Sequence, residues 1–146
     1  MAGNGAGQES VKGIVEVLLI PNRDLEVLQS FNSRGKITVS AYVRMDTPEH
    51  RESAVSEFMQ QMQSRLDECG SSPECREALK EDMEIVGLYL KTNGHRDQVG
   101  LAIFSCAAEL FWRVFPLPVA LPSQVSVGPE FDLEPLKRAD GQRRSS

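Results

Sequence analysis

Basic and aromatic side chains alternate along one predicted strand and could contact a nucleic acid. Lys36, Tyr42 and Arg44 stand an even number of residues apart, so they share one face of an extended chain. Lysine and arginine neutralise phosphates, and a tyrosine ring can stack on a base. We therefore identify these three residues, with Lys137 and Arg138 near the C-terminus, as candidate RNA-binding residues. In the alternative interpretation, the ring of Tyr42 packs beneath a helix, with its hydroxyl at the edge of the core.

The chain contains no pattern typical of a catalytic or metal-binding site. His95 lies in a predicted polar turn, and neither a Ser-His-Asp arrangement nor a G-x-S-x-G sequence accompanies it. The acidic pairs Glu77/Glu81 and Glu81/Asp82 fall on the predicted solvent face of a helix, whereas paired catalytic carboxylates need a cleft. The cysteines lack the C-x2-C spacing of a zinc site. We therefore expect no enzymatic activity, no metal, no cofactor and no small-molecule substrate.

The three cysteines are an odd number and follow no recognisable secretory signal. This usage favours a reduced, cytoplasmic compartment, in which cysteines act as small apolar side chains in or near the core. Cys69 and Cys75 flank a predicted turn between two helices, so a disulfide between them is geometrically feasible. Reduced cysteines are nevertheless the expectation from the sequence.

Acidic residues concentrate in the middle of the chain. The formal net charge is −5, and 12 of the 21 acidic residues but only 6 of the 16 basic ones lie between Asp46 and Asp97. This surplus opposes a dedicated nucleic-acid binder, so any RNA contact must avoid the acidic region. The same region could instead face a protein partner, or it could be an ordinary solvated surface. No membrane association is expected, because apolar runs such as Val17–Ile20 are too short to span a bilayer.

Hydrophobic periodicity predicts an α+β fold. It consists of a mainly antiparallel sheet of about four strands, with a long helical hairpin packed on one face. The hairpin helices begin at Thr47-Pro48 and Ser72-Pro73, each a capping residue followed by proline. In the strand at 36–45, apolar residues alternate with polar ones, so one of its faces should be at least partly solvated. Further strands are predicted at 99–106, 109–115 and 124–127, and short helices from Asn22 and over 132–138.

The predicted domain organisation has three parts. Residues 1–21 form a leader, in which 11–20 fit both a strand and a helix, with a helix favoured. Residues 22–138 form a single α+β domain, and residues 139–146 form a basic disordered tail. Prolines recur within residues 116–122 and exclude regular strand pairing, so this segment is expected to be an extended connection or a sheet edge.

Three segments, in their order and spacing around the helical hairpin, resemble a known family. They are Leu25–Val43, a short helix leading into a strand; Gly100–Val119, an apolar strand and its return; and Val125–Leu136. Residues 22–138 are similar in this way to the N-terminal domain of the bacterial and archaeal relatives of the eukaryotic-type class 1 peptide chain release factor. The resemblance implies an α+β domain that is followed by a middle domain and a C-terminal domain.

The resemblance also has consequences for activity. In the true release factors, the N-terminal domain reads the stop codon, and a Gly-Gly-Gln sequence in the middle domain promotes peptide release. This chain has Glu68–Pro73 where the family has Asn-Ile-Lys-Ser between the long helices. The family's Tyr-x-Cys-x-x-x-Phe is matched only at Phe131, with Val125 and Val127 in the other places. These departures count against stop-codon reading, and peptide release is not expected without a middle domain.

The sequence therefore predicts a non-catalytic, release-factor-like N-terminal domain that associates with the ribosome or RNA in translation or ribosome rescue. The alternative is a protein–protein interaction module that keeps the fold without an RNA role. Its contact surface would be the acidic helical hairpin or residues 116–122. A third hypothesis, an enzyme with an unrecognised site, requires a cleft containing a group with a strongly shifted pKa.

Overall fold

The computed structural model describes residues 19–92 and 98–145. The chain falls into two compact units: a central unit of residues 30–132 and a second unit formed by the two chain ends. The single domain predicted at 22–138 therefore spans parts of both units.

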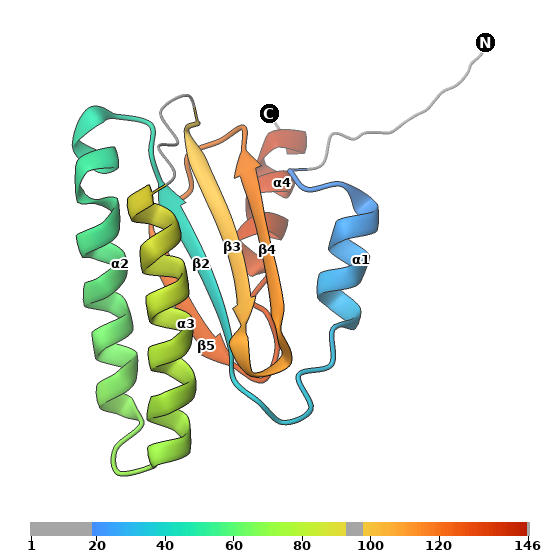
Figure 1. Cartoon of the computed structure of the whole chain (residues 1–146). Coiled ribbons are helices and arrows are strands. Elements are labelled where there is room, and N and C mark those ends of the chain that lie inside the picture. Colours follow the sequence, from blue (N-terminus) through green and yellow to red (C-terminus); the bar gives the residue numbers. More distant parts are fainter. Residues whose placement is uncertain (1–18, 93–97, 146) are drawn as a thin grey trace. The chain divides into compact units, whose positions relative to one another are not determined.

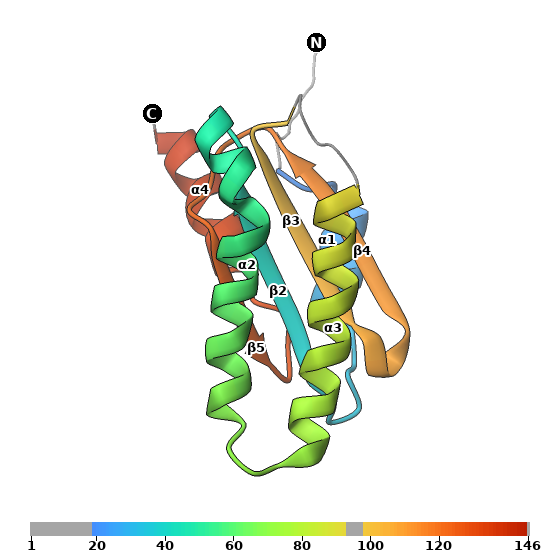
Figure 2. The same ribbon diagram turned by 60° about the vertical axis from the view of Figure 1, so that its left-hand side comes forward.

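The central unit is a four-stranded antiparallel sheet with a helical hairpin on one face (Figure 1). The strand order is β4-β3-β2-β5. Helices α2 and α3 run side by side against the sheet, as Figure 2 shows from a second direction. The predicted α+β fold, antiparallel sheet and helical hairpin are thus confirmed. The elements are β2 (Thr38–Arg44), α2 (Pro48–Glu68), α3 (Pro73–Thr92), β3 (Gly100–Cys106), the short η2 (Ala107–Glu109), β4 (Phe111–Leu117) and β5 (Gln124–Gly128).

The chain-end unit contains α4 (Glu134–Ser145) and nearly all of α1 (Asn22–Ser30). Helix α4 continues well past residue 138, so the prediction of a disordered tail is wrong for the described residues. Ala139 in this stretch is a strong helix former and is buried, which favours continuation of the helix. The helix favoured at 11–20 lies almost entirely outside the described residues.

Local capping signals fix where the hairpin helices begin. Thr47 Oγ1 accepts a hydrogen bond from the His50 backbone N–H at 3.1 Å, and Pro48 occupies the first turn of α2. At the start of α3, Ser72 Oγ accepts a hydrogen bond from the Cys75 backbone N–H at 3.3 Å. Both starts agree with the sequence prediction. None of the described helices combines the length and the apolar character needed to cross a bilayer.

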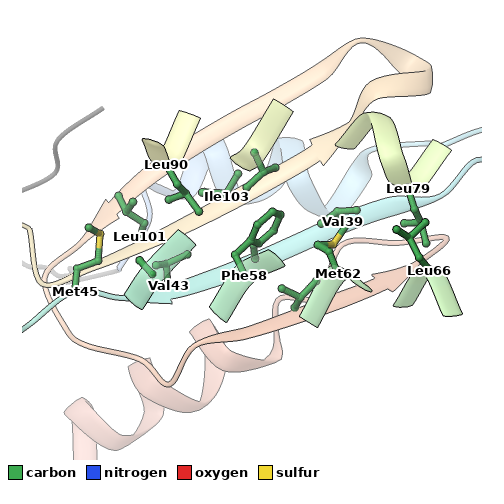
Figure 3. Close-up of a cluster of buried hydrophobic side chains, with 14 residues drawn as sticks. Val39, Val43, Met45, Phe58, Met62, Leu66, Leu79, Leu90, Leu101 and Ile103 are labelled. Carbon is green, nitrogen blue, oxygen red and sulfur yellow. The ribbon is translucent and has the colours of Figure 1, made fainter. Parts of the chain in front are cut away.

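The main hydrophobic core lies between the hairpin and the sheet (Figure 3). Each fully buried apolar side chain contributes about 1.5–3 kcal/mol to folding, so this layer dominates the stability of the central unit. The core side chains come from both helices and from the two central strands: Phe58, Met62, Leu66, Leu79, Val86, Leu90, Val39, Val43, Leu101 and Ile103.

Strand β2 is buried on both faces, contrary to the prediction that one face would be partly solvated. Thr38, Ser40 and Tyr42 point away from the core helices, yet the segment from Gly128 to Asp132 satisfies their hydroxyls. Thr38 Oγ1 donates to the Gly128 carbonyl at 2.8 Å, and Ser40 Oγ accepts from the Asp132 N–H at 2.8 Å. Polar residues therefore remain buried here because each has a hydrogen-bond partner.

Pro116 lies within β4, opposite Leu101 of β3. The prediction that proline would exclude regular pairing from residue 116 onward is therefore wrong for this residue. Because β4 is an edge strand, a proline nitrogen directed away from β3 removes no ladder hydrogen bond. The strand extends to Leu117 for this reason.

Cys69 and Cys75 form a disulfide across the turn between α2 and α3. The expectation that all cysteines stay reduced is therefore wrong at this pair. The turn brings the two Cα atoms to 5.8 Å, which is within the usual range for a disulfide. Cys106 is free and buried, as expected for a small apolar side chain.

Asp82 is a buried carboxylate that ties α3 to the end of β3. Its side chain is 1% exposed, and Oδ1 accepts hydrogen bonds from Ser105 Oγ at 2.5 Å and from the Ala107 N–H at 3.0 Å. Burial raises the pKa of Asp82 above its usual 3.8, although these two hydrogen bonds act in the opposite direction. The hydrogen bonds of this carboxyl therefore hold α3 against the end of β3. Ionisation of the same carboxyl destabilises the folded protein, because the buried charge loses its hydration.

Reduction of the Cys69–Cys75 disulfide should lower the free energy of unfolding of the central unit. A disulfide closing so short a loop restricts the unfolded chain by about 2 kcal/mol. Urea unfolding with and without reductant measures this difference. In the double variant Cys69→Ser/Cys75→Ser, reductant should have no effect, and an equal effect of reductant on both proteins would contradict the prediction.

The variant Asp82→Asn should remove a pH-dependent destabilisation. The raised pKa means that the folded protein binds a proton more tightly than the unfolded chain. Stability therefore falls as pH rises through the unfolded value of 3.8 toward the folded value. An asparagine oxygen can accept both hydrogen bonds without ionising, so the variant should gain stability relative to the parent protein between pH 3 and neutral pH. Urea unfolding across this range is the measurement, and parallel pH profiles would contradict it.

Asp82→Ala provides the matched control for the hydrogen bonds. It leaves the Ser105 hydroxyl and the Ala107 N–H without their acceptor, which should cost about 2–4 kcal/mol relative to Asp82→Asn at every pH.

Candidate functional site

The five candidate RNA-binding residues are distributed over both units. Lys36 is exposed just before β2, and Arg44 ends the same strand. Extended geometry separates these two positions by roughly 25 Å. Lys137 and Arg138 are exposed on α4, in the chain-end unit. Within the central unit, Lys36 and Arg44 therefore belong to separate surfaces.

Tyr42 is buried, with 1% of its surface exposed. Its hydroxyl donates to the Asp132 carbonyl at 2.5 Å, and its ring meets Phe104 edge-on, with centroids 6.0 Å apart. Burial raises the pKa of the hydroxyl well above its usual range, with the nearby Asp132 acting in the same direction. The ring offers no free face to a base, which contradicts its assignment as an RNA-stacking residue. The alternative of a packed ring is correct, although the ring lies on the sheet face opposite α2 and α3.

Arg44 is held by an acidic neighbour. Its Nε and Nη2 donate to the two carboxylate oxygens of Asp46 at 2.8 and 3.1 Å. The hydrogen bond and the opposite charge raise the pKa of Arg44, and the hydrogen bond lowers the pKa of Asp46. His50 Nδ1 lies 3.5 Å from the same carboxylate. Much of the positive charge of Arg44 is therefore balanced locally, which weakens its attraction for a phosphate.

A polar pocket of about 350 Å³ lies at this end of β2. Two of its lining side chains already have hydrogen-bond partners. Arg44 binds Asp46, and Gln61 hydrogen-bonds the backbone of Ser123 and Val125. The pocket is large enough to accept a small polar molecule. Its lining residues are Arg44, His50, Glu57, Gln60, Gln61, Pro122 and Ser123.

Lys36 lies in a groove of about 490 Å³ whose opposite wall is acidic. Glu74, Glu77 and Glu81 of α3 line this groove, and all three are exposed. Three carboxylates beside one ammonium group repel a phosphate and attract a cationic group. The sequence prediction of a solvent face is correct for Glu77 and Glu81 and wrong for Asp82, which is buried. It also missed the position of the glutamates beside Lys36. Only the packing of α3 next to the start of β2 brings them together.

Lys137 borders a small pocket of about 60 Å³ in the chain-end unit. The walls come mainly from apolar side chains, including Leu19, Leu25 and Leu136. The exposed Lys137 thus lies beside apolar side chains.

Comparison with known proteins supports the fold and gives no family assignment. No family model matches the chain, and no curated protein matches it. Among solved structures, a chain described as "Archaeal protein" is similar, with a TM-score of 0.57 and 15% sequence identity over 81% of this chain. This chain covers only 34% of that chain. The similarity supports the α+β architecture alone.

Truncation of Tyr42 should be costly for stability because the ring is packed. Tyr42→Ala should lower the free energy of unfolding by about 3–5 kcal/mol, whereas Tyr42→Phe should cost only about 1 kcal/mol, the value of the lost hydrogen bond. Urea unfolding of both variants tests this. A cost below about 0.5 kcal/mol for Tyr42→Ala is typical of an exposed ring and would restore the stacking hypothesis.

Proposed function

We propose that this chain is a non-catalytic, release-factor-like N-terminal module that associates with the ribosome or its RNA in the cytoplasm. The proposal rests on the order of elements along the chain. A short helix, a central strand, a long helical hairpin and a return through antiparallel strands follow one another in the order on which the family resemblance of residues 22–138 depends. A role in translation or ribosome rescue is the function that this resemblance implies.

The electrostatic surroundings favour one RNA contact over the others. Lys36 faces three glutamates and Arg44 is paired with Asp46, so both offer a phosphate less attraction than an isolated basic group would. Lys137 and Arg138 are exposed on α4, in the chain-end unit. We therefore assign the main phosphate contact to α4, and a smaller contribution to Lys36 and Arg44.

The acidic groove beside Lys36 favours a second candidate, a protein-interaction module. Glu74, Glu77 and Glu81 present carboxylates to solvent along α3. Such a surface attracts a basic protein segment and repels the ribosomal RNA backbone. Association with a protein in the absence of RNA would favour this second function.

Co-sedimentation of the chain with ribosomes across a salt series tests the first proposal. Phosphate contacts release counterions, so binding should be saturable at low salt and weaken steeply as salt rises. In the variant Lys137→Glu/Arg138→Glu, the slope of log K against log salt should shrink by roughly 1.5, because about two phosphate contacts are lost.

The matched control is Lys80→Glu/Lys91→Glu, which makes the same charge change at two exposed positions of α3. It should leave the salt slope unchanged, because the acidic hairpin is not the RNA contact. Equal losses in the two double variants, or no saturable binding at low salt by the folded chain, would overturn the proposal.

A further inference from the structure

The two outer edges of the sheet differ in how their backbone groups are satisfied. At the β5 edge, the Val125 N–H donates to Gln61 Oε1 at 2.8 Å, and the Val125 carbonyl accepts from Arg65 Nη2 at 3.2 Å. Gln61 Nε2 also donates to the Ser123 carbonyl at 3.3 Å. Side chains of α2 thus cap the β5 edge, which prevents a further strand from pairing there.

The pairing register gives the direction of the backbone groups in β4. The residues that lie opposite one another across the sheet are Val125, Ala41, Ile103 and Val114. In an antiparallel ladder, opposite residues alternate between hydrogen-bonded and non-hydrogen-bonded pairs. Val125 directs its N–H and carbonyl to α2, so Val125 and Ala41 do not hydrogen-bond to each other. Ala41 therefore exchanges its backbone hydrogen bonds with Ile103 of β3. Since Ile103 directs its groups to β2, Val114 must direct its own N–H and carbonyl away from β3.

Among residues 19–92 and 98–145, no strand pairs with the outer edge of β4. Backbone groups of Trp112 and Val114 and the Pro116 carbonyl face outward, since residues two apart share a direction. Pro116 has no N–H to offer. Within the described residues, one of these outward groups has a side-chain partner: Arg113 Nη1 donates to the Trp112 carbonyl at 2.8 Å. An incoming strand would find the N–H and carbonyl of Val114 available.

One flank of α3 lies beside this edge and is apolar at one end and acidic at the other. The rings of Tyr89 and Trp112 meet edge to face, with centroids 5.4 Å apart. Ile85, one turn before Tyr89, is 42% exposed. Glu81, a further turn back, is exposed and lines the same groove as Ala108, which lies just before β4. A strand laid along β4 would thus meet aromatic, aliphatic and carboxylate groups on its helix side.

We propose that the outer edge of β4 binds an extended, basic segment of a partner protein as a fifth strand. Backbone hydrogen bonds to Trp112 and Val114 would hold the segment, as in other complexes formed by strand addition. Alternate apolar side chains of the segment would cover Trp112, Val114 and Ile85, and a lysine or arginine at its end would meet Glu81. The inference does not depend on ribosome association.

Charge decides against a second copy of this chain as the occupant. Antiparallel pairing of two β4 edges about a two-fold axis would place both α3 helices on the same side of one continuous sheet. Each copy would then add its own exposed Glu81 and Glu84 to that side of the sheet. Like charges across such an interface oppose association, whereas a lysine or arginine of a different protein complements them.

Binding of a designed peptide tests the proposal. The probe is a fluorescein-labelled heptapeptide, Lys-Thr-Val-Thr-Val-Thr-Lys, whose two valines and two terminal lysines share one face of a strand. Terminal lysines at both ends allow either strand direction. Fluorescence anisotropy should give saturable binding to the full chain with a Kd on the order of 10⁻⁵ M. Hydrogen exchange at the Val114 amide should slow on binding, because the peptide occupies that N–H.

Two changes remove backbone hydrogen bonds between β4 and the peptide, one in the protein and one in the peptide. Val114→Pro deletes the outward N–H without deleting a bond to β3, and Val114→Thr retains it. Affinity should fall at least about tenfold in Val114→Pro, which is about 1.4 kcal/mol, and stay within about twofold in Val114→Thr. The same peptide with both valine nitrogens methylated should also bind at least about tenfold more weakly than the parent peptide.

A charge reversal on α3 tests the same peptide site without changing β4, in case Val114→Pro does not fold. Glu81→Lys leaves β4 untouched and should weaken the lysine peptide while strengthening a peptide with glutamates in place of the lysines. Indifference of binding to peptide methylation and to Glu81→Lys would overturn the proposal, as would absence of saturable binding up to about 1 mM peptide. Dimerisation of the chain alone that protects the Val114 amide would overturn the choice of partner in favour of a second copy.

Discussion

The burial of β2 on both faces is the constraint on which the rest of the structure depends. One face carries the apolar side chains that receive α2 and α3, and the other carries hydroxyls that bond to the segment Gly128–Asp132. A buried hydroxyl left without a partner would cost about 1–3 kcal/mol, so this segment must stay in place. The faces of the central strand are thus occupied by folding, and binding is left to the sheet edges, the strand ends and the helix surfaces.

The distribution of charge then divides the remaining surfaces by the partner that each can attract. The α3 glutamates dominate the groove around Lys36, and Asp46 offsets Arg44. A positive residue counts as a phosphate ligand only where its neighbours leave its potential positive. The alternation along the strand therefore shows which basic side chains are available, but the neighbours that other elements place beside them determine what those side chains can bind.

Local signals in the sequence were sufficient to predict the helices and strands, but not which side chains from other elements surround a given residue. The helix starts at Thr47-Pro48 and Ser72-Pro73 were predictable because a capping residue and a proline act within one turn. The burial of Tyr42 was not, because the carbonyl that receives its hydroxyl lies 90 residues away in the sequence. The Cys69–Cys75 spacing allowed a disulfide, but spacing alone does not tell a paired cysteine from a reduced one.

The contrast between the two sheet edges connects stability with binding. An unprotected edge invites uncontrolled pairing, and proteins limit it with charges, prolines or covering side chains. This chain uses Gln61 and Arg65 to cover β5, while in the described part of the chain β4 has Pro116 at its far end and Arg113 Nη1 on the Trp112 carbonyl. The proline restricts pairing to the first part of β4, which is too short to template extended aggregation but long enough for two outward N–H groups to hold a partner segment. An edge blocked at one end and flanked by carboxylates therefore combines protection against self-association with selectivity for a basic partner.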